Sequence, residues 1–510
     1  MYFNHDPRKK NVIRSSVLNA VNYSLSLIMG LGYRMFFLRI LTVEYLGIDG
    51  LFSNILGILG LAEMGITDAI IYRLYKPIST DDVRQVGALM GFFRRTYHII
   101  ALVILLLGGS VCPFLNEFIN DSSTVPGDVN LYAVFLLLLI QSASTYLFSY
   151  KFSLLNADQK QYQTSIINTV KSFTRYTCQL LTLALTKNYT FTLVSGIFVT
   201  LVINWLGGMW VTRQYPLVFE NNGDIIPEEK RAIYKDTAAG FLHDIGYTVV
   251  TSTDNILLTK FFGLAATGIY SNYALIVSSV SKIMDVAIGS IGPSFGNVHV
   301  MESDTEAYLI YKKALFLNFW IAGLLVCCLY VLIDDFVVLW LRKELFLDPF
   351  TVGIICLLFY IQSMRGVSSV YTYSSGLFTK DKLRPVIEAV LNIVLSVIFL
   401  QWIGTAGIFL GTIVSDMLTV FWRVPYLLYK YIFHKRVMEY WKMYAVNLGV
   451  AAGAIWLSQA LKTFVFGKTI TLLTWIGSGA LCAAVYCLLH FLIFHGTEEF
   501  RYFWKLVHFP

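Results

Sequence analysis

The sequence predicts an all-α protein that crosses a membrane many times. Three observations support this. Of the 510 residues, 56% are hydrophobic and only 14% are charged, and the mean hydropathy is +0.63, whereas soluble domains carry about 25% charged residues. Long apolar stretches follow one another along almost the whole chain. A short segment also recurs in the two halves of the sequence, which predicts duplicated helix bundles.

At roughly 20 apolar residues per span, we expect about 14 transmembrane helices. Their centres lie near Leu27, Ile58, Val103, Leu139, Tyr176, Leu201, Val249, Ser279, Cys328, Gln362, Val394, Leu418, Val450 and Leu481. The connecting stretches are too short for a folded soluble domain. An enzyme with an extramembrane catalytic domain is therefore not expected, and the apolar run after Arg8 is too long for a cleavable signal peptide.

The recurring segment is LGIDGLFSNI at 46–55 and LAATGIYSNY at 264–273, and the same spacing relates Ala69-Ile70 to Ala287-Ile288. Each copy opens the second long apolar segment of a block of six. Six spans separate the copies, so both enter the membrane in the same direction and the repeat is parallel. We predict an N-terminal lobe at 1–222, a C-terminal lobe at 223–433, and two further helices with an interfacial tail at 434–510.

The net charge of +7 is better explained by topology than by nucleic acid binding. With the N-terminus inside, most Lys and Arg fall at the cytoplasmic ends of the spans, as the positive-inside rule requires. Both termini are then expected in the cytoplasm. The seven cysteines lie in apolar segments without CxxC spacing, and the eight histidines form no HExxH pattern, so no metal site, disulfide or cofactor is expected.

An ionisable residue within a span is costly unless it is paired or wetted, which makes each one a candidate functional residue. Lys171 and Arg175 lie four residues apart, on one face of a helix, near its middle. Arg365 lies in the middle of a span in the other half, and Arg34 and Arg39 lie in the outer part of the first span. Guanidinium and ammonium groups suit phosphate oxygens, so these five cations are candidates for binding a diphosphate.

Two alternatives remain open at this point. The cations could instead pair with acids on other helices and hold the bundle together. The acids able to do so are Glu63, Asp68, Asp244, Asp254, Glu388 and Asp416. Among them, Asp416 near the middle of a span could bind a coupling cation or proton, and Asp254, Glu63 and Asp68 are further candidates for ion coupling or gating.

Residues 44–78, EYLGIDGLFSNILGILGLAEMGITDAIIYRLYKPI, and 253–276, TDNILLTKFFGLAATGIYSNYALI, resemble the polysaccharide transporter branch of the multidrug/oligosaccharidyl-lipid/polysaccharide (MOP) flippase superfamily. The resemblance extends over roughly residues 10–430. It implies two six-helix lobes in a V around a cationic cavity, often with two further helices. Arg34, Arg39, Lys171, Arg175 and Arg365 are the positions able to line such a cavity, and Asp254-Asn255 matches a pair that opens the second lobe.

The resemblance also implies a function. Similar proteins are bacterial cytoplasmic-membrane flippases that move undecaprenyl-diphosphate-linked oligosaccharides outward for capsule, O-antigen, exopolysaccharide or teichoic acid assembly, beside glycan polymerases and glycosyltransferases. We expect alternating access without enzymatic activity. The alternatives are a cation-coupled drug exporter, which would favour an acidic and aromatic cavity, and a glycan polymerase, which would need a larger loop with clustered catalytic carboxylates.

Overall fold

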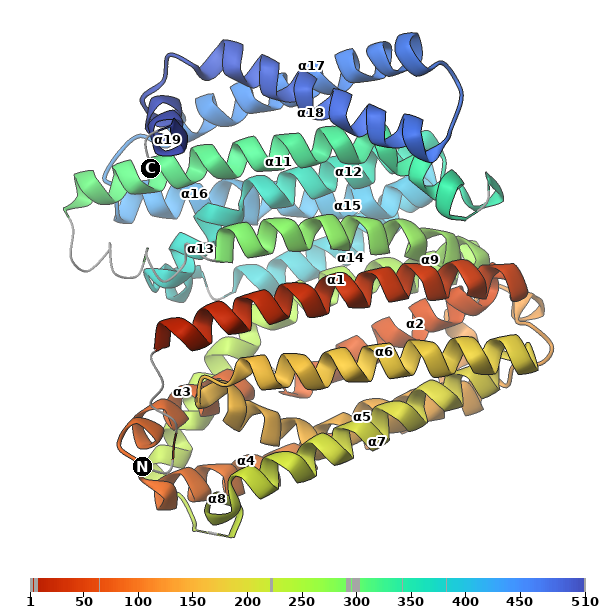
Figure 1. Ribbon diagram of the computed structural model, residues 1–510, viewed down its shortest axis with the longest axis vertical. Helices are drawn as coiled ribbons and strands as arrows, with labels where there is room; N and C mark the ends of the chain where they lie inside the picture. Colours follow the sequence, from red (N-terminus) through yellow and green to blue (C-terminus); the bar gives the residue numbers. More distant parts are fainter. Residues whose placement is uncertain are drawn as a thin grey trace. The chain divides into compact units, whose positions relative to one another are not determined.

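The computed structural model describes residue 3 and residues 8–63, 65–220, 223–289, 295, 303–341, 343–381 and 383–508. Every regular element in these ranges is a helix (Figure 1). The predicted all-α class is confirmed. The chain divides into two compact units, Met1–Gly268 and Ile269–Pro510. The boundary between the two units lies within the helix Pro227–Gly289. The predicted boundary at 222/223 follows the sequence repeat and stays a prediction.

The helices of the two units follow the chain in order. The first unit holds α1 (Arg8–Ile40), α2 (Val43–Leu59), η1 (Gly60–Glu63), α3 (Ile66–Ser79), α4 (Val83–Val111), α5 (Leu131–Ala157), α6 (Gln161–Thr186), α7 (Tyr189–Gln214), α8 (Pro216–Glu220) and the first part of α9 (Pro227–Gly289). The second unit holds the rest of α9, α11 (Asp304–Trp340), α12 (Pro349–Met364), α13 (Gly366–Ser374), η5 (Leu377–Asp381), α14 (Arg384–Ile403), α15 (Thr405–Leu418), α16 (Val420–Tyr431), α17 (Met438–Phe466), α18 (Leu472–Phe494) and α19 (Glu498–His508).

Ten helices among the described residues are long and apolar enough to cross a membrane. All of the predicted span centres lie in helices of the structure. The difference from 14 has physical causes. Helices α1 and α6 carry many polar side chains, α2 has only 17 residues, and two predicted spans belong to α9. The number of spans therefore stays a prediction.

Helix α9 turns back on itself at Gly263, whose φ of 84° and ψ of 176° interrupt the helix. The Thr259 and Thr267 hydroxyls are hydrogen-bonded at 2.8 Å. Eight residues of straight helix would separate them by about 12 Å. A side chain other than glycine is strained at this positive φ, so Gly263 allows the two predicted spans near Val249 and Ser279 to be joined without a loop.

Within the first unit, the two copies of the repeat cross in backbone contact. A Cβ atom on Gly47 would lie 2.0 Å from the carbonyl oxygen of Leu264, and one on Gly268 would lie 2.2 Å from that of Val43. Each copy therefore supplies a glycine that lets the other helix approach. Small residues at such crossings are typical of helix packing in membranes.

The second unit contains a tight hairpin of α14 and α15, joined at Gly404. Cβ atoms on Gly407 and Gly411 would collide with the α14 backbone at Phe399 and Ser396. Ser396 donates to the Ile408 carbonyl at 2.9 Å, and Asn392 donates to the Thr412 hydroxyl at 2.8 Å. These two hydrogen bonds between α14 and α15 are one helical turn apart. One turn further along the hairpin, positions 388 and 416 face each other.

The C-terminal helices α17 and α18 lie along α11 (Figure 1). Lys462 of α17 forms an ion pair with Asp335 of α11 at 2.6 Å, and the Trp475 indole N–H of α18 donates to the Leu332 carbonyl at 3.2 Å. Lys312 of α11 pairs with Glu499 of α19 at 2.8 Å. Helices α17, α18 and α19 are thus held on α11 by polar contacts as well as by packing.

The turn between α5 and α6 contains a buried polar triad. Lys160 lies 2.7 Å from Asp158 and donates to the Tyr215 hydroxyl at 2.9 Å, and Tyr215 donates to Asp158. All three residues are less than 9% exposed. The triad ties the ends of α5, α6 and α7 together.

We expect Lys160→Met to lower the free energy of unfolding by about 3 kcal/mol, because it leaves the Asp158 carboxylate buried without its cation. The thermal unfolding midpoint in detergent measures the loss. The double variant Lys160→Met, Asp158→Leu should be more stable than the single one. An unchanged midpoint for Lys160→Met would mean that the pair does not support the fold.

Candidate functional site

Helices α1 and α6 face each other with polar side chains. Ser165 of α6 donates to Asn19 of α1, and one turn further along Thr169 donates to Asn22 at 3.0 Å. The residue numbers rise together in both helices, so α1 and α6 run parallel. Polar side chains in a helix of membrane-spanning length need such partners. Because α1 and α6 supply them to each other, both helices can be less apolar than their neighbours.

The predicted cations Lys171 and Arg175 lie further along α6. Both side chains are half-buried. The Lys171 ammonium donates to the amide oxygen of Asn204, a buried residue of α7, at 3.4 Å, and the Arg175 guanidinium lies 4.7 Å from the centre of the Tyr176 ring. The two cations repel each other. An anion placed between them would relieve this repulsion.

Arg34 of α1 joins these cations around a carboxylate that the sequence analysis did not select, Asp49 of α2. Arg34 and Arg175 both act electrostatically on Asp49, which also accepts a hydrogen bond from the Tyr189 hydroxyl. We call Arg34, Lys171, Arg175 and Asp49 the cationic cluster. Its members come from three helices, and its described residues carry three positive charges and one negative charge.

The other predicted residues of the first unit lie outside this cluster. Arg39 is exposed at the end of α1, with its guanidinium 5.9 Å from the Phe36 ring centre. Glu63 contacts the Tyr146 hydroxyl, and Asp254 is buried in α9. The Asp68 side chain lies outside the described residues. Roles for these residues in ion coupling or gating stay predictions.

In the second unit, Arg365 lies beside Asp416, with 3.3 Å between Nη1 and Oδ2. Asp416 is 1% exposed. It also acts electrostatically on Glu388, at the next matching position of the α14–α15 hairpin, and Glu388 contacts Arg384. Two ionised carboxyl groups repel each other, and a proton on one of them relieves this repulsion, so the pair is a candidate for holding a proton. Arg365 is thus not a bare cation.

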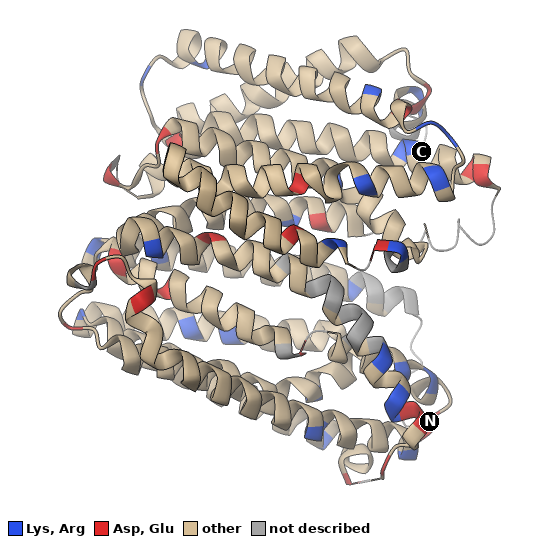
Figure 2. Cartoon of the chain, turned by 180° about the vertical axis from the view of Figure 1, so that it is seen from behind, with Lys and Arg blue, Asp and Glu red and all other residues tan. Residues whose placement is uncertain are grey.

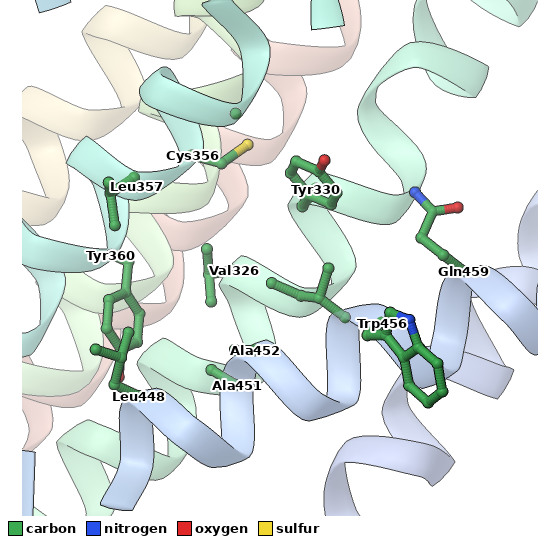
Figure 3. A pocket seen from close by; sticks show the side chains of 12 residues that line it. Val326, Tyr330, Cys356, Leu357, Tyr360, Leu448, Ala451, Ala452, Trp456 and Gln459 are labelled. Carbon is green, nitrogen blue, oxygen red and sulfur yellow. The ribbon is translucent and has the colours of Figure 1, made fainter. Parts of the chain in front are cut away.

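Charged residues lie mostly toward the ends of the helices, with a few part-way along them (Figure 2). Lys171 and Arg175, near the middle of α6, belong to this minority, whereas Arg365 lies at the junction of α12 and α13. A pocket of about 430 Å³ in the second unit lies elsewhere, between α11, α12 and α17 (Figure 3). It is lined by apolar and uncharged polar side chains, among them Tyr330, Tyr360 and Trp456. Such a lining suits hydrocarbon and offers no counter-charge to a diphosphate.

Sequence reasoning missed Asp49 and Asn204 because neither is near Lys171 or Arg175 in the chain. One signal was present in the repeat. Asp49 occupies the position that Thr267 occupies in the second copy, so a carboxylate stands where the repeat allows a neutral hydroxyl. Because only one of the two copies carries a charge at this position, the charge is not needed for the fold that the copies share, which indicates a functional role.

The sequence matches no known family profile, and no curated protein is recognisably similar to it. Solved structures do share its fold. An inward-facing multidrug resistance MATE family transporter of the MOP superfamily superposes with a TM-score of 0.63 at 13% identity, covering 82% of this chain and 98% of that chain. The lipid II flippase MurJ, in an inward closed conformation, gives a TM-score of 0.63 at 11% identity, covering 94% of this chain and 99% of that chain.

A third similar structure is a MOP superfamily transporter from Pyrococcus furiosus, with a TM-score of 0.52 at 12% identity, covering 81% of this chain and 93% of that chain. That transporter is described as having a binding pocket of reverse polarity. At these identities the comparisons establish the fold. The chain has the fold of MOP superfamily transporters, as the sequence resemblance implied at the level of the superfamily.

Asp49 and Arg34 should be energetically coupled. We expect Asp49→Asn to lower stability, because Arg34 and Arg175 lose their counter-charge, and Arg34→Gln to restore part of it. The coupling in a double-mutant cycle should be on the order of 1 kcal/mol, measured from thermal unfolding. Arg39→Gln, a cation exposed on the same helix, is the matched control and should be additive with Asp49→Asn. Additivity for Arg34 would contradict the cluster.

Proposed function

We propose that this protein is a flippase that moves a lipid-linked oligosaccharide with a diphosphate headgroup, carried on undecaprenol, across the bacterial cytoplasmic membrane by alternating access. The observation that carries the proposal is the excess of positive charge in the cationic cluster. Arg34, Lys171 and Arg175 lie within helices of membrane-spanning length, where a concentration of positive charge is costly. An anionic ligand that neutralises them would offset that cost.

The chemistry of the cluster fits a diphosphate. Guanidinium groups donate paired hydrogen bonds to phosphate oxygens, and the Lys171 ammonium adds a compact charge. Moving a diphosphate through bare hydrocarbon would be prohibitive. Asp49 limits the affinity, because it competes with the ligand for Arg34 and Arg175. The headgroup can therefore be bound during transit and still released.

Two further observations support a lipid-linked substrate. The structure of the lipid II flippase MurJ covers 94% of this chain. The part of the chain that it leaves uncovered is shorter than residues 434–510, so part of this C-terminal segment has a counterpart in MurJ. Moving negative charge outward is also favoured by the membrane potential, by about 2.3 kcal/mol per charge per 100 mV. Polymerases and glycosyltransferases of the same pathway would act on either side of this step.

Removing the two α6 cations should abolish headgroup transport. We expect Lys171→Ala, Arg175→Ala to lower the rate of outward movement of a prenyl-diphosphate oligosaccharide in proteoliposomes by more than about a hundredfold, since each charge-assisted hydrogen bond contributes about 1.5–3 kcal/mol. Lys187→Asn, at the exposed end of the same helix, is the control and should transport normally. Equal transport by both variants would place the headgroup elsewhere.

The Glu388–Asp416 carboxyl pair is the candidate for ion coupling. If a proton on this pair drives the return of the empty carrier, Glu388→Gln should make transport insensitive to an imposed pH gradient, because an amide cannot exchange that proton. Glu344→Gln, at an exposed position of the same unit, should keep the dependence. A gradient response that persists in Glu388→Gln would exclude this pair as the coupling site.

A second function, export of organic cations, is favoured by the aromatic surroundings of Asp49. Tyr33 acts electrostatically with Asp49 and its ring centre lies 5.6 Å from that of Tyr176, and Tyr189 donates a hydrogen bond to Asp49. Carboxylates and aromatic rings recognise organic cations. Efflux of a fluorescent cationic dye from the same proteoliposomes tests this function. Efflux that is lost in Asp49→Asn but kept in the Lys171, Arg175 double variant would favour the exporter over the flippase.

A further inference from the structure

A groove of about 740 Å³ lies in the second unit where α14 begins, and its lining residue Arg384 contacts Glu388 of the Arg365–Asp416–Glu388 group. Three cations line it: Lys380 at the end of η5, Arg384 in the first turn of α14, and Arg423 of α16. Asp381 lies among them. These four residues form the charged rim of the groove.

The rim carries more positive than negative charge. Asp381 bridges two of the cations, at 2.7 Å from Arg384 Nε and 3.1 Å from Arg423 Nε, and Arg384 also contacts Glu388. Lys380 is exposed, with its ammonium 3.6 Å from the centre of the Tyr431 ring. The Arg423 side chain is 37% exposed. Lys380 can therefore reach a ligand without breaking an ion pair to Asp381, and Arg423 is partly exposed while its Nε remains paired with Asp381.

The wall below the rim is apolar and uncovered. Leu383 is 68% exposed, Ile387 52%, Leu418 56% and Trp422 43%. Ile387 belongs to a helix that is long and apolar enough to cross a membrane, and Leu418 and Trp422 lie in a continuous apolar stretch of α15 and α16. Apolar side chains exposed on such segments face hydrocarbon, and tryptophan favours the boundary with the headgroups.

From this combination we infer that the groove binds an anionic phospholipid of the surrounding membrane. Its phosphate would lie between Lys380 and Arg423, and an acyl chain would follow Ile387 and Leu418. Basic pockets between helices at the membrane face bind lipid headgroups in this way. A soluble anion could contact the charged rim, but it has no hydrocarbon chain to bury against the apolar wall. The bound lipid is a resident ligand and is distinct from the transported substrate.

The test measures binding and needs no transport. The whole protein in phosphatidylcholine nanodiscs is titrated with phosphatidylglycerol, and retained lipid is counted by native mass spectrometry. We expect saturable binding of phosphatidylglycerol that weakens about fivefold for each cation removed in Lys380→Ala and in Lys380→Ala, Arg423→Ala. Lys380→Ala alters only an exposed side chain and should fold. Lys468→Ala, an exposed lysine between α17 and α18, should bind like the unchanged protein.

Four outcomes would overturn the inference. Equal binding by the Lys380 and Arg423 variants would mean that the rim is not used. Equal binding of phosphatidylcholine would mean that the groove does not select lipids by the charge of their headgroup. Displacement by glycerol phosphate at the same concentration would indicate a site for free anions. Displacement by a prenyl diphosphate at lower concentration than phosphatidylglycerol would assign the groove to the transported lipid.

Discussion

The cost of a charge within a membrane-length helix organises this structure. Such a charge must be paired, hydrogen-bonded or wetted, because hydrocarbon offers nothing in return for lost hydration. The pairing connects helices that are distant in the chain. Lys462 joins α17 to α11 through Asp335, and Arg365 joins α12 to α15 through Asp416. Partnered charges therefore fix which helices pack together, while the apolar surfaces supply most of the buried area.

The two units balance their interior charges differently. In the second unit, a series of contacts runs from Arg365 through Asp416, Glu388, Arg384 and Asp381 to Arg423, and each of these three cations has an acid beside it. In the first unit, Arg34 and Arg175 both act on one carboxylate, Asp49, and the cationic cluster as defined has more cations than acids. The repeat explains why the two copies share a fold. They differ in chemistry at one position, where the first copy has Asp49 and the second has Thr267.

Periodicity and hydropathy were enough to predict the helices, because a span of apolar residues has few alternatives in a membrane. They were also enough to predict Lys171 and Arg175 as neighbours, since four residues make one turn. Partners on other helices could not be chosen from the sequence. Asp416 was one of six acids that could have paired with a cation, and Asp49 was not among them. The direct connection at Gly263 was hidden for a similar reason, because a single glycine does not reveal its φ.

A carrier for an anion must hold its ligand strongly enough to carry it through the membrane and weakly enough to release it. Three unopposed cations would satisfy only the first condition. Asp49 answers the second, because it lies on α2 whereas Arg34 and Arg175 lie on α1 and α6. Any motion that brings α2 closer to these cations strengthens their attraction to Asp49 and weakens their hold on the ligand. In the proposed flippase, release would then be coupled to helix movement by electrostatics, and α2 is the helix that crosses the second repeat copy through Gly47 and Gly268.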